Sequence, residues 1–144
     1  MQVQEIMTTG ITTVGRNDDL QMVTDLMAAG HLRHIPVLED EGLVGVVSQR
    51  DVFSARMSST MGVGEKGQRG FLHTILVKEV MRHPVTTVGP ATLVSDAASI
   101  MIGQSIGCLP VVNDGDLVGI LTKTDLLRCL RETDEEADNP HADS

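Results

Sequence analysis

The stretch Leu43-Val44-Gly45-Val46-Val47-Ser48-Gln49-Arg50-Asp51 runs from an apolar segment into a hydroxyl and, three residues later, a carboxylate. The stretch Leu117–Asp125, 74 residues further on, repeats this order of residue types. The pattern favours a strand that ends where a helix begins. The hydroxyl and the acid can cap the free amides of that helix, or the same groups can hold a ligand. The turn alone does not decide between these two interpretations.

The repeat extends far beyond this turn. Without a gap, Val3–Phe53 aligns with Val77–Leu127, and 15 of the 51 residue pairs are identical. Most other pairs in the periodic apolar segments are conservative substitutions. A gapless self-match of this length indicates two copies of one supersecondary unit.

Each copy predicts the same order of elements, β-α-β-β-α, preceded by a short helical lead-in. We expect lead-ins at 3–7 and 77–81, first strands at 11–14 and 85–88, hairpins at 35–47 and 109–121, and final helices at 51–57 and 125–131. Asn17 or Asp18, and Thr92, are expected to cap the helices that follow the first strands. Neither copy can bury its apolar face alone, so the two are expected to share one core.

The domain boundaries follow from the repeat and from the composition between its copies. We expect a first repeat at 1–56, a flexible Gly/Ser-rich linker at 57–70 and a second repeat at 71–131. The last residues, 132–144, are acidic and nearly free of apolar side chains. Such a composition predicts a disordered, solubilising tail.

The composition argues against several functional classes. The net charge is −9, and the chain has no Trp, no Tyr and two Phe, which disfavours a nucleic-acid partner. No apolar run has membrane-spanning length and the N-terminus does not resemble a signal peptide, so we expect no membrane partner and a cytoplasmic protein. Cys108 and Cys129 have neither metal nor disulfide spacing, and His31 and His34 lack a further ligand nearby, so we expect no metal. No nucleophile–base arrangement is present, so we expect no catalytic residues.

The two copies resemble the CBS domain, and the chain resembles a stand-alone tandem CBS pair, or Bateman module. The resemblance is carried by Glu5-Ile6-Met7 and Glu79-Val80-Met81, by Arg33-His34-Ile35-Pro36-Val37 and Cys108-Leu109-Pro110-Val111, and by both Gly…Ser/Thr-x-x-Asp turns. It covers roughly residues 1–131. The second copy is similar to that of the acetoin-utilisation type of stand-alone CBS protein. The resemblance implies an α/β pseudo-twofold pair with two clefts, adenosine-containing ligands and a homodimer formed through helices.

The resemblance also implies which residues contact a ligand. The Asp of each turn can accept both ribose hydroxyls, as acidic residues do in dinucleotide folds. In the family the early strand lines the base pocket, and the residues before the middle strand reach phosphate in the cleft of the other repeat. Gly107 and Cys108, the counterparts of Arg33 and His34, carry no charge, so we expect two unequal sites. The preferred site comprises Arg33, His34, Thr87, Leu109, Pro110, Thr122 and Asp125. The weaker or phosphate-free site comprises Thr13, Ile35, Pro36, Ser48 and Asp51.

Purely structural roles, without a ligand, stay open for several of these residues. Thr13 and Thr87 are also simply good strand residues, and the apolar members can be plain core. Ser48 and Thr122 are equally well explained as helix caps. We therefore expect a regulatory sensor of AMP, ADP or ATP, without a cofactor and not an enzyme, that signals to an unknown regulated protein by a conformational change. The alternatives are a structural or dimerisation module with vestigial clefts, or binding of S-adenosylmethionine or NADH.

Overall fold

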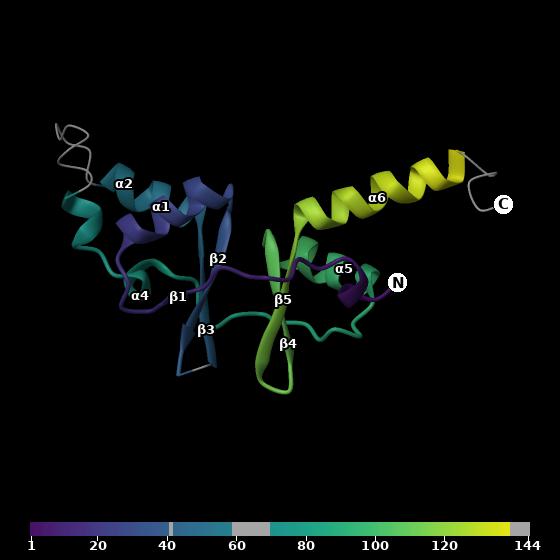
Figure 1. Cartoon of the computed structure of the whole chain (residues 1–144), viewed down its shortest axis with the longest axis horizontal. Coiled ribbons are helices and arrows are strands. Elements are labelled where there is room, and N and C mark those ends of the chain that lie inside the picture. Colours follow the sequence, from purple (N-terminus) through teal and green to yellow (C-terminus); the bar gives the residue numbers. More distant parts are fainter. Residues whose placement is uncertain (41, 59–69, 139–144) are drawn as a thin grey trace. The chain divides into compact units, whose positions relative to one another are not determined.

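The computed structural model describes residues 1–40, 42–58 and 70–138, and within it the chain forms two compact α/β units (Figure 1). Thr12–Val85 form one unit, here the N-unit. Met1–Ile11, together with the chain from Thr86 onward, form the other, here the C-unit. The predicted α/β class is confirmed. Each unit contains most of one repeat and the lead-in of the other. This exchange of lead-ins shapes the site described below.

The N-unit has a three-stranded sheet in the order β1-β2-β3, with β1 parallel to β2 and β2 antiparallel to β3. Its elements are β1 (Val14–Gly15), α1 (Leu20–Gly30), β2 (His34–Glu39), β3 (Gly42–Ser48), α2 (Gln49–Ser58) and α4 (Val77–Val80). The linker expected at 57–70 begins inside α2, and its residues 59–69 lie outside the described residues.

The C-unit repeats this plan with a two-stranded antiparallel sheet. Its elements are the 3-10 helix η1 (Val3–Glu5), α5 (Val94–Gln104), β4 (Cys108–Asn113), β5 (Asp116–Thr122) and α6 (Lys123–Asp138). A single parallel bridge from Val88 to Val111 takes the place of β1. Both hairpins are confirmed, and Asp40 and Asp114 adopt the left-handed backbone (φ 49° and 50°) that short hairpin turns require.

The lead-ins pack in the unit opposite to the one that their sequence position suggests. Val3 is fully buried in the core of the C-unit, and its repeat partner Val77 is fully buried in the core of the N-unit. Thr8 exchanges two backbone hydrogen bonds with Ile120 on β5, and Arg82 exchanges two with Val46 on β3. Each lead-in therefore completes the free edge of a hairpin that belongs to the other repeat of the sequence.

This exchange explains why the first strands are shorter than predicted. Strands were expected at 11–14 and 85–88, but pairing begins at Val14 in one copy and consists of the Val88 bridge in the other. Thr8 pairs in the C-unit while Val14 pairs in the N-unit. The residues between them connect the two units and are unavailable for strand pairing.

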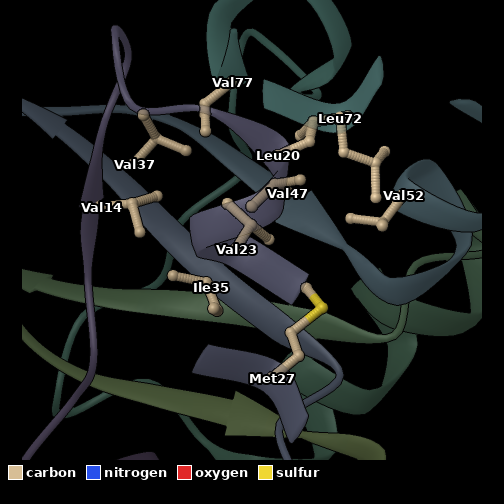
Figure 2. Packing of buried hydrophobic residues seen from close by; sticks show 10 residues of the cluster. All are labelled: Val14, Leu20, Val23, Met27, Ile35, Val37, Val47, Val52, Leu72 and Val77. Carbon is tan, nitrogen blue, oxygen red and sulfur yellow. The ribbon is translucent and has the colours of Figure 1, made fainter. Parts of the chain in front are cut away.

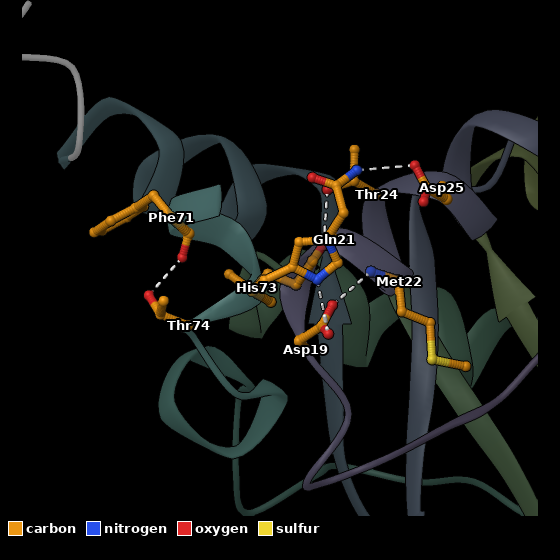
Figure 3. A network of polar contacts seen from close by, with 9 residues as sticks. Asp19, Gln21, Met22, Thr24, Asp25, Phe71, His73 and Thr74 are labelled. Carbon is orange, nitrogen blue, oxygen red and sulfur yellow. Dashed lines mark hydrogen bonds and ion pairs between the residues drawn. The ribbon is translucent and has the colours of Figure 1, made fainter. Parts of the chain in front are cut away.

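The helix caps lie one residue later than predicted, and Figure 3 shows the cap of α1. Asp19, not Asn17 or Asp18, is the N-cap of α1, and its carboxylate accepts the Met22 amide at 2.9 Å. Asp18 instead accepts the Gly15 amide at 2.7 Å. Thr92 likewise accepts the Gly89 amide at 3.1 Å, and Leu93 holds the cap position of α5. Both predicted caps close the turn after the first strand, a role with the same residue preferences.

The acidic end of the chain is more ordered than its composition predicts. Helix α6 continues to Asp138, so residues 132–138, which were expected to be disordered, are helical. Residues 139–144 of the predicted tail lie outside the described residues. Glu132, Glu135 and Glu136 favour this continuation, because Glu is a good helix former.

Aliphatic side chains supply the core of each unit, as the scarcity of aromatics requires. In the N-unit Leu20, Val23 and Met27 from α1 lie against Ile35 and Val47 of the sheet (Figure 2). The corresponding cluster of the C-unit contains Ala97 and Met101 of α5. The i, i+3, i+4 spacing of these positions is the helical periodicity that predicted both helices.

The contact between the lead-in and the hairpin depends on glycine. A Cβ added at Gly45 would lie 2.5 Å from Met81 Sδ and 3.1 Å from the Arg82 carbonyl oxygen. We therefore expect Gly45→Ala to lower the free energy of unfolding by about 1–3 kcal/mol through overpacking. Gly103→Ala on α5 is the matched control, because no atom lies within 4 Å of its added Cβ, and it should stabilise by up to about 1 kcal/mol. Urea unfolding measures both, and equal stability of the two variants would contradict the packing argument.

The α1 cap should make stability depend on pH. The Met22 amide, followed by His73, lowers the pKa of Asp19 against an opposing effect of burial. Because the folded pKa lies below the unfolded one of about 3.9, the charged carboxylate adds stability above that pH and loses it as the pH falls further. Asp19→Asn keeps an acceptor but removes the charge. The stability difference between wild type and this variant should shrink between about pH 5 and pH 3; a constant difference would refute the effect.

Candidate functional site

The turn from β5 into α6 is closed by reciprocal hydrogen bonds between Thr122 and Asp125. The Thr122 amide donates to Asp125 Oδ2 at 2.9 Å, and its hydroxyl lies 3.0 Å from the same oxygen. The Asp125 amide lies 3.3 Å from Thr122 Oγ1. This is a capping box with Asp in place of Glu, so the structural interpretation of the motif holds in full.

Two further groups contact the Asp125 carboxylate, whose residue is only 4% exposed. Thr8 Oγ1 donates to Oδ1 at 3.0 Å, and Arg128 Nη1 lies 3.6 Å from the same oxygen. Thr8 comes from the exchanged lead-in, 117 residues earlier in the chain. Sequence reasoning missed it, because the repeat alignment pairs Thr8 with Arg82 and gives no signal that the lead-in contacts this turn.

The corresponding turn of the N-unit has the same cap and a more available carboxylate. The Ser48 amide donates to Asp51 Oδ2 at 2.8 Å, and the Asp51 amide donates to Ser48 Oγ at 3.0 Å. Asp51 is half-buried, and its Oδ1 has no hydrogen-bond partner among the described residues. The counterparts of Thr8 and Arg128 are Arg82 and Ser54. Both turns therefore cap their helix in the same way, but the Asp51 carboxylate accepts fewer hydrogen bonds than the Asp125 carboxylate.

The remaining predicted residues fall into two groups. Thr13 is half-buried and Thr87 is exposed; each immediately precedes a valine that pairs with the middle strand of its unit. The apolar residues proposed to wall the base are buried in β2 and β4: Ile35, Pro36, Leu109 and Pro110. Ile35 and Leu109 belong to the two core clusters, so their contact with a ligand stays a prediction.

Arg33 and His34 lie beside the turn of their own repeat. The Arg33 carbonyl accepts the amide of Gln49, the first residue of α2, at 2.8 Å. His34 is half-buried and pairs with Ser48 across the hairpin. Both belong to the N-unit and Asp125 belongs to the C-unit. Their predicted contribution to a ligand held by Asp125 stays a prediction.

Two other properties bear on the class of site. Among the described residues, no three His, Cys, Asp or Glu side chains are grouped as metal ligands would be. None of the described helices is long and apolar enough to cross a membrane.

Comparison with known proteins places this geometry in a family. The family model described as "CBS domain" matches residues 3–58 and again 77–132. The chain is 32% identical over 124 residues to the CBS domain-containing protein YhcV of Bacillus subtilis, covering 86% of this chain and 81% of that protein. Three other curated relatives at 30–32% identity are longer, and the chain spans only 21–36% of their length.

Solved structures agree with the fold. A crystal structure described as an acetoin utilization protein (AcuB) from Vibrio cholerae has a TM-score of 0.78 and 32% identity, and the match covers 96% of both chains. A crystal structure of CBSX2 in complex with AMP has a TM-score of 0.76 and 25% identity, covering 92% of this chain and 98% of that one.

The unequal partners of the two carboxylates predict unequal effects on stability. Asp125→Ala removes a buried carboxylate that accepts from the Thr122 amide, the Thr122 hydroxyl and the Thr8 hydroxyl, and should cost about 1–3 kcal/mol. Asp51→Ala removes one half-buried cap and should cost about 1 kcal/mol or less. Chemical denaturation of both variants measures the difference. A larger loss for Asp51→Ala would contradict the structural role of Asp125.

Proposed function

The chain belongs to the CBS domain family, and on that basis we propose that it is a regulatory module that binds an adenine nucleotide such as AMP, ADP or ATP. The observation that carries the proposal is the duplicated Ser/Thr-x-x-Asp turn, which places a carboxylate beside the first turn of α2 and of α6. The likeness to a CBS protein crystallised with AMP supports adenosine as the recognised part of the ligand.

The chemistry of the turn suits a nucleotide. A ribose offers two neighbouring hydroxyls, and an ionised carboxylate accepts both, as acidic residues do in dinucleotide-binding folds. The free amides at the start of a helix favour a phosphate at the same turn. Thr13 and Thr87 precede the short strand pairings of the two units, and we propose that their backbone groups contact the adenine edge.

The number of acceptor sites makes the two carboxylates unequal. A carboxylate has about four lone-pair sites. Asp51 uses one of them on the Ser48 amide, so both ribose hydroxyls can bind without breaking a bond. Asp125 already accepts the Thr8 hydroxyl, the Thr122 amide and the Thr122 hydroxyl. A ribose at Asp125 therefore has to displace one internal donor.

We propose that the two turns prefer different forms of the ligand. The Asp51 turn takes an adenosyl ligand without requiring phosphate, because its carboxylate is available. The Asp125 turn takes the phosphorylated nucleotide, with Arg33 and His34 supplying positive charge as the family resemblance implies. Arg33 is exposed and makes no ion pair with a described residue, which is consistent with a cation kept for a ligand.

The displaced donor supplies a route for the signal. When a ribose hydroxyl replaces Thr8 on Asp125, the lead-in loses one of its contacts with the β5–α6 turn. Residues 9–13 connect this lead-in directly to β1 of the N-unit. We propose that ligand occupancy is passed along this connection to a regulated protein.

Homodimerisation through helices is part of the proposal. Phe53 on α2 and its repeat counterpart Leu127 on α6 are both exposed, as is Leu130. Apolar side chains at equivalent places of two repeats support a contact between copies of the chain.

One observation favours the second candidate, a structural module with vestigial clefts. The Asp125 carboxylate already interacts with Thr8, Thr122 and Arg128, so the C-unit turn is closed by contacts within the chain. Binding of another adenosyl ligand, S-adenosylmethionine or NADH, is a further variant of the main proposal.

Ligand titration separates these candidates. A nucleotide at 100 times its Kd should raise the stability of the fold by about 2.7 kcal/mol, seen as a thermal shift with AMP, ADP or ATP. Calorimetry should find Arg33→Ala at least tenfold weaker for ATP, while S-adenosylmethionine binding through Asp51 is unchanged. Asp51→Asn should show the reverse, and Arg16→Ala, at a half-buried arginine of the N-unit that pairs with Glu39, should alter neither.

Different outcomes would contradict nucleotide binding and the inequality of the two turns. The structural alternative is favoured if none of AMP, ADP, ATP, S-adenosylmethionine or NADH shifts the melting temperature. Two equal ATP sites that are unaffected by Arg33→Ala would leave nucleotide binding intact and refute the inequality of the turns.

A further inference from the structure

A cavity of about 720 Å³ lies in the N-unit between the second half of α1 and the first turns of α2. Its volume is typical of small-molecule sites. Met27 and Val52, both buried, line it, and both belong to the core cluster drawn in Figure 2. The other apolar side chains that line it are Ala28, Leu32 and Phe53.

Cationic side chains dominate the polar part of the lining. Arg33, Arg50 and Arg56 line the cavity together with His31, and none of the described residues that line it is acidic. The chain has 11 Lys and Arg against 20 Asp and Glu, so three arginines around one cavity are unusual in this acidic chain. Within the described residues neither Arg33 nor Arg50 forms an ion pair.

The second repeat serves as an internal control for what the fold requires. The counterparts of the four cationic or titratable residues are Ser105, Gly107, Thr124 and Leu130. The apolar part of the lining, by contrast, is kept, since Met27 and Val52 correspond to Met101 and Leu126. The same α/β hairpin and helices form in the C-unit without this charge. Folding therefore does not explain the arginine cluster.

We propose that this cavity is a second binding site, for a small organic anion that carries phosphate or carboxylate groups on an apolar body. Guanidinium groups bind both anions with paired hydrogen bonds, and Met27 with Leu32 offers apolar surface to the rest of the ligand. The site is separate from the Asp51 carboxylate, which is not among the lining residues and turns back to the Ser48 amide. This proposal shares Arg33 with the proposed nucleotide site, so its tests vary Arg50 and Arg56 instead, which have no role in that site.

Two probes distinguish the anionic groups: inorganic pyrophosphate for phosphate and citrate for carboxylate. Each is titrated into the full chain by calorimetry at fixed ionic strength. The double variant Arg50→Ala/Arg56→Ala should bind the preferred probe at least tenfold more weakly. Lys78→Ala/Arg131→Ala removes the same charge from exposed positions elsewhere and should stay within twofold of wild type.

Further variants keep the test decisive. Arg50 is exposed, so Arg50→Ala alone is the substitute if the double variant does not fold by circular dichroism, with an expected loss of at least threefold. Asp51→Asn and Asp125→Asn should retain probe binding even where they abolish nucleotide binding, which separates failure of this proposal from failure of the proposed function.

Three results would overturn the proposal. The first is equal weakening in both double variants, which indicates general screening by charge. The second is no binding of either probe. The third is no probe binding combined with a salt-sensitive dimer that Arg50→Ala/Arg56→Ala dissociates, which would assign the cavity to an acidic segment of a second copy.

Discussion

The contact on which both units depend is that of a lead-in methionine with a hairpin glycine. Met7 lies over Gly119 and Met81 lies over Gly45, and in each case a side chain on the glycine would occupy the place of the methionine. The buried Val3 and Val77 anchor the same lead-ins in the two cores. A segment that provides both core and sheet edge cannot be removed without exposing apolar surface, so the two repeats fold as partners and not as independent halves.

The exchange also gives a physical meaning to the identities between the repeats. Met7/Met81 and Gly45/Gly119 are identical pairs in the alignment, and each methionine contacts the glycine of the other repeat. The gapless match, the hairpins and their turns could be predicted because they depend on local periodicity and turn chemistry. The exchange could not be predicted, because an alignment of two copies states which residues are equivalent and not which of them touch.

The candidate site was predictable to the same extent. Ser48, Asp51, Thr122 and Asp125 lie three apart in sequence, so their mutual hydrogen bonds follow from the motif. Thr8 is remote from Asp125 in sequence and has no polar equivalent of similar size in the other copy, so its contact could only be found in the structure. The caps at Asp19 and Leu93 were displaced by one residue because Asp18 and Thr92 close the preceding turn, a competition between two motifs with the same residue preferences.

The Thr8–Asp125 hydrogen bond links the exchanged lead-in to the proposed signalling route. A neutral donor on a buried carboxylate contributes on the order of 1–3 kcal/mol, and a ligand that replaces it binds with that much less net free energy. In return, a ribose that displaces the Thr8 hydroxyl would couple ligand binding to the loss of one contact between the lead-in and the β5–α6 turn, as proposed above. A carboxylate that was fully available would bind more tightly but would transmit nothing through this contact. No side-chain donor competes with a ribose for Asp51, so that turn has the arrangement suited to holding a ligand. The Thr8 hydroxyl competes for Asp125, so that turn has the arrangement suited to a switch.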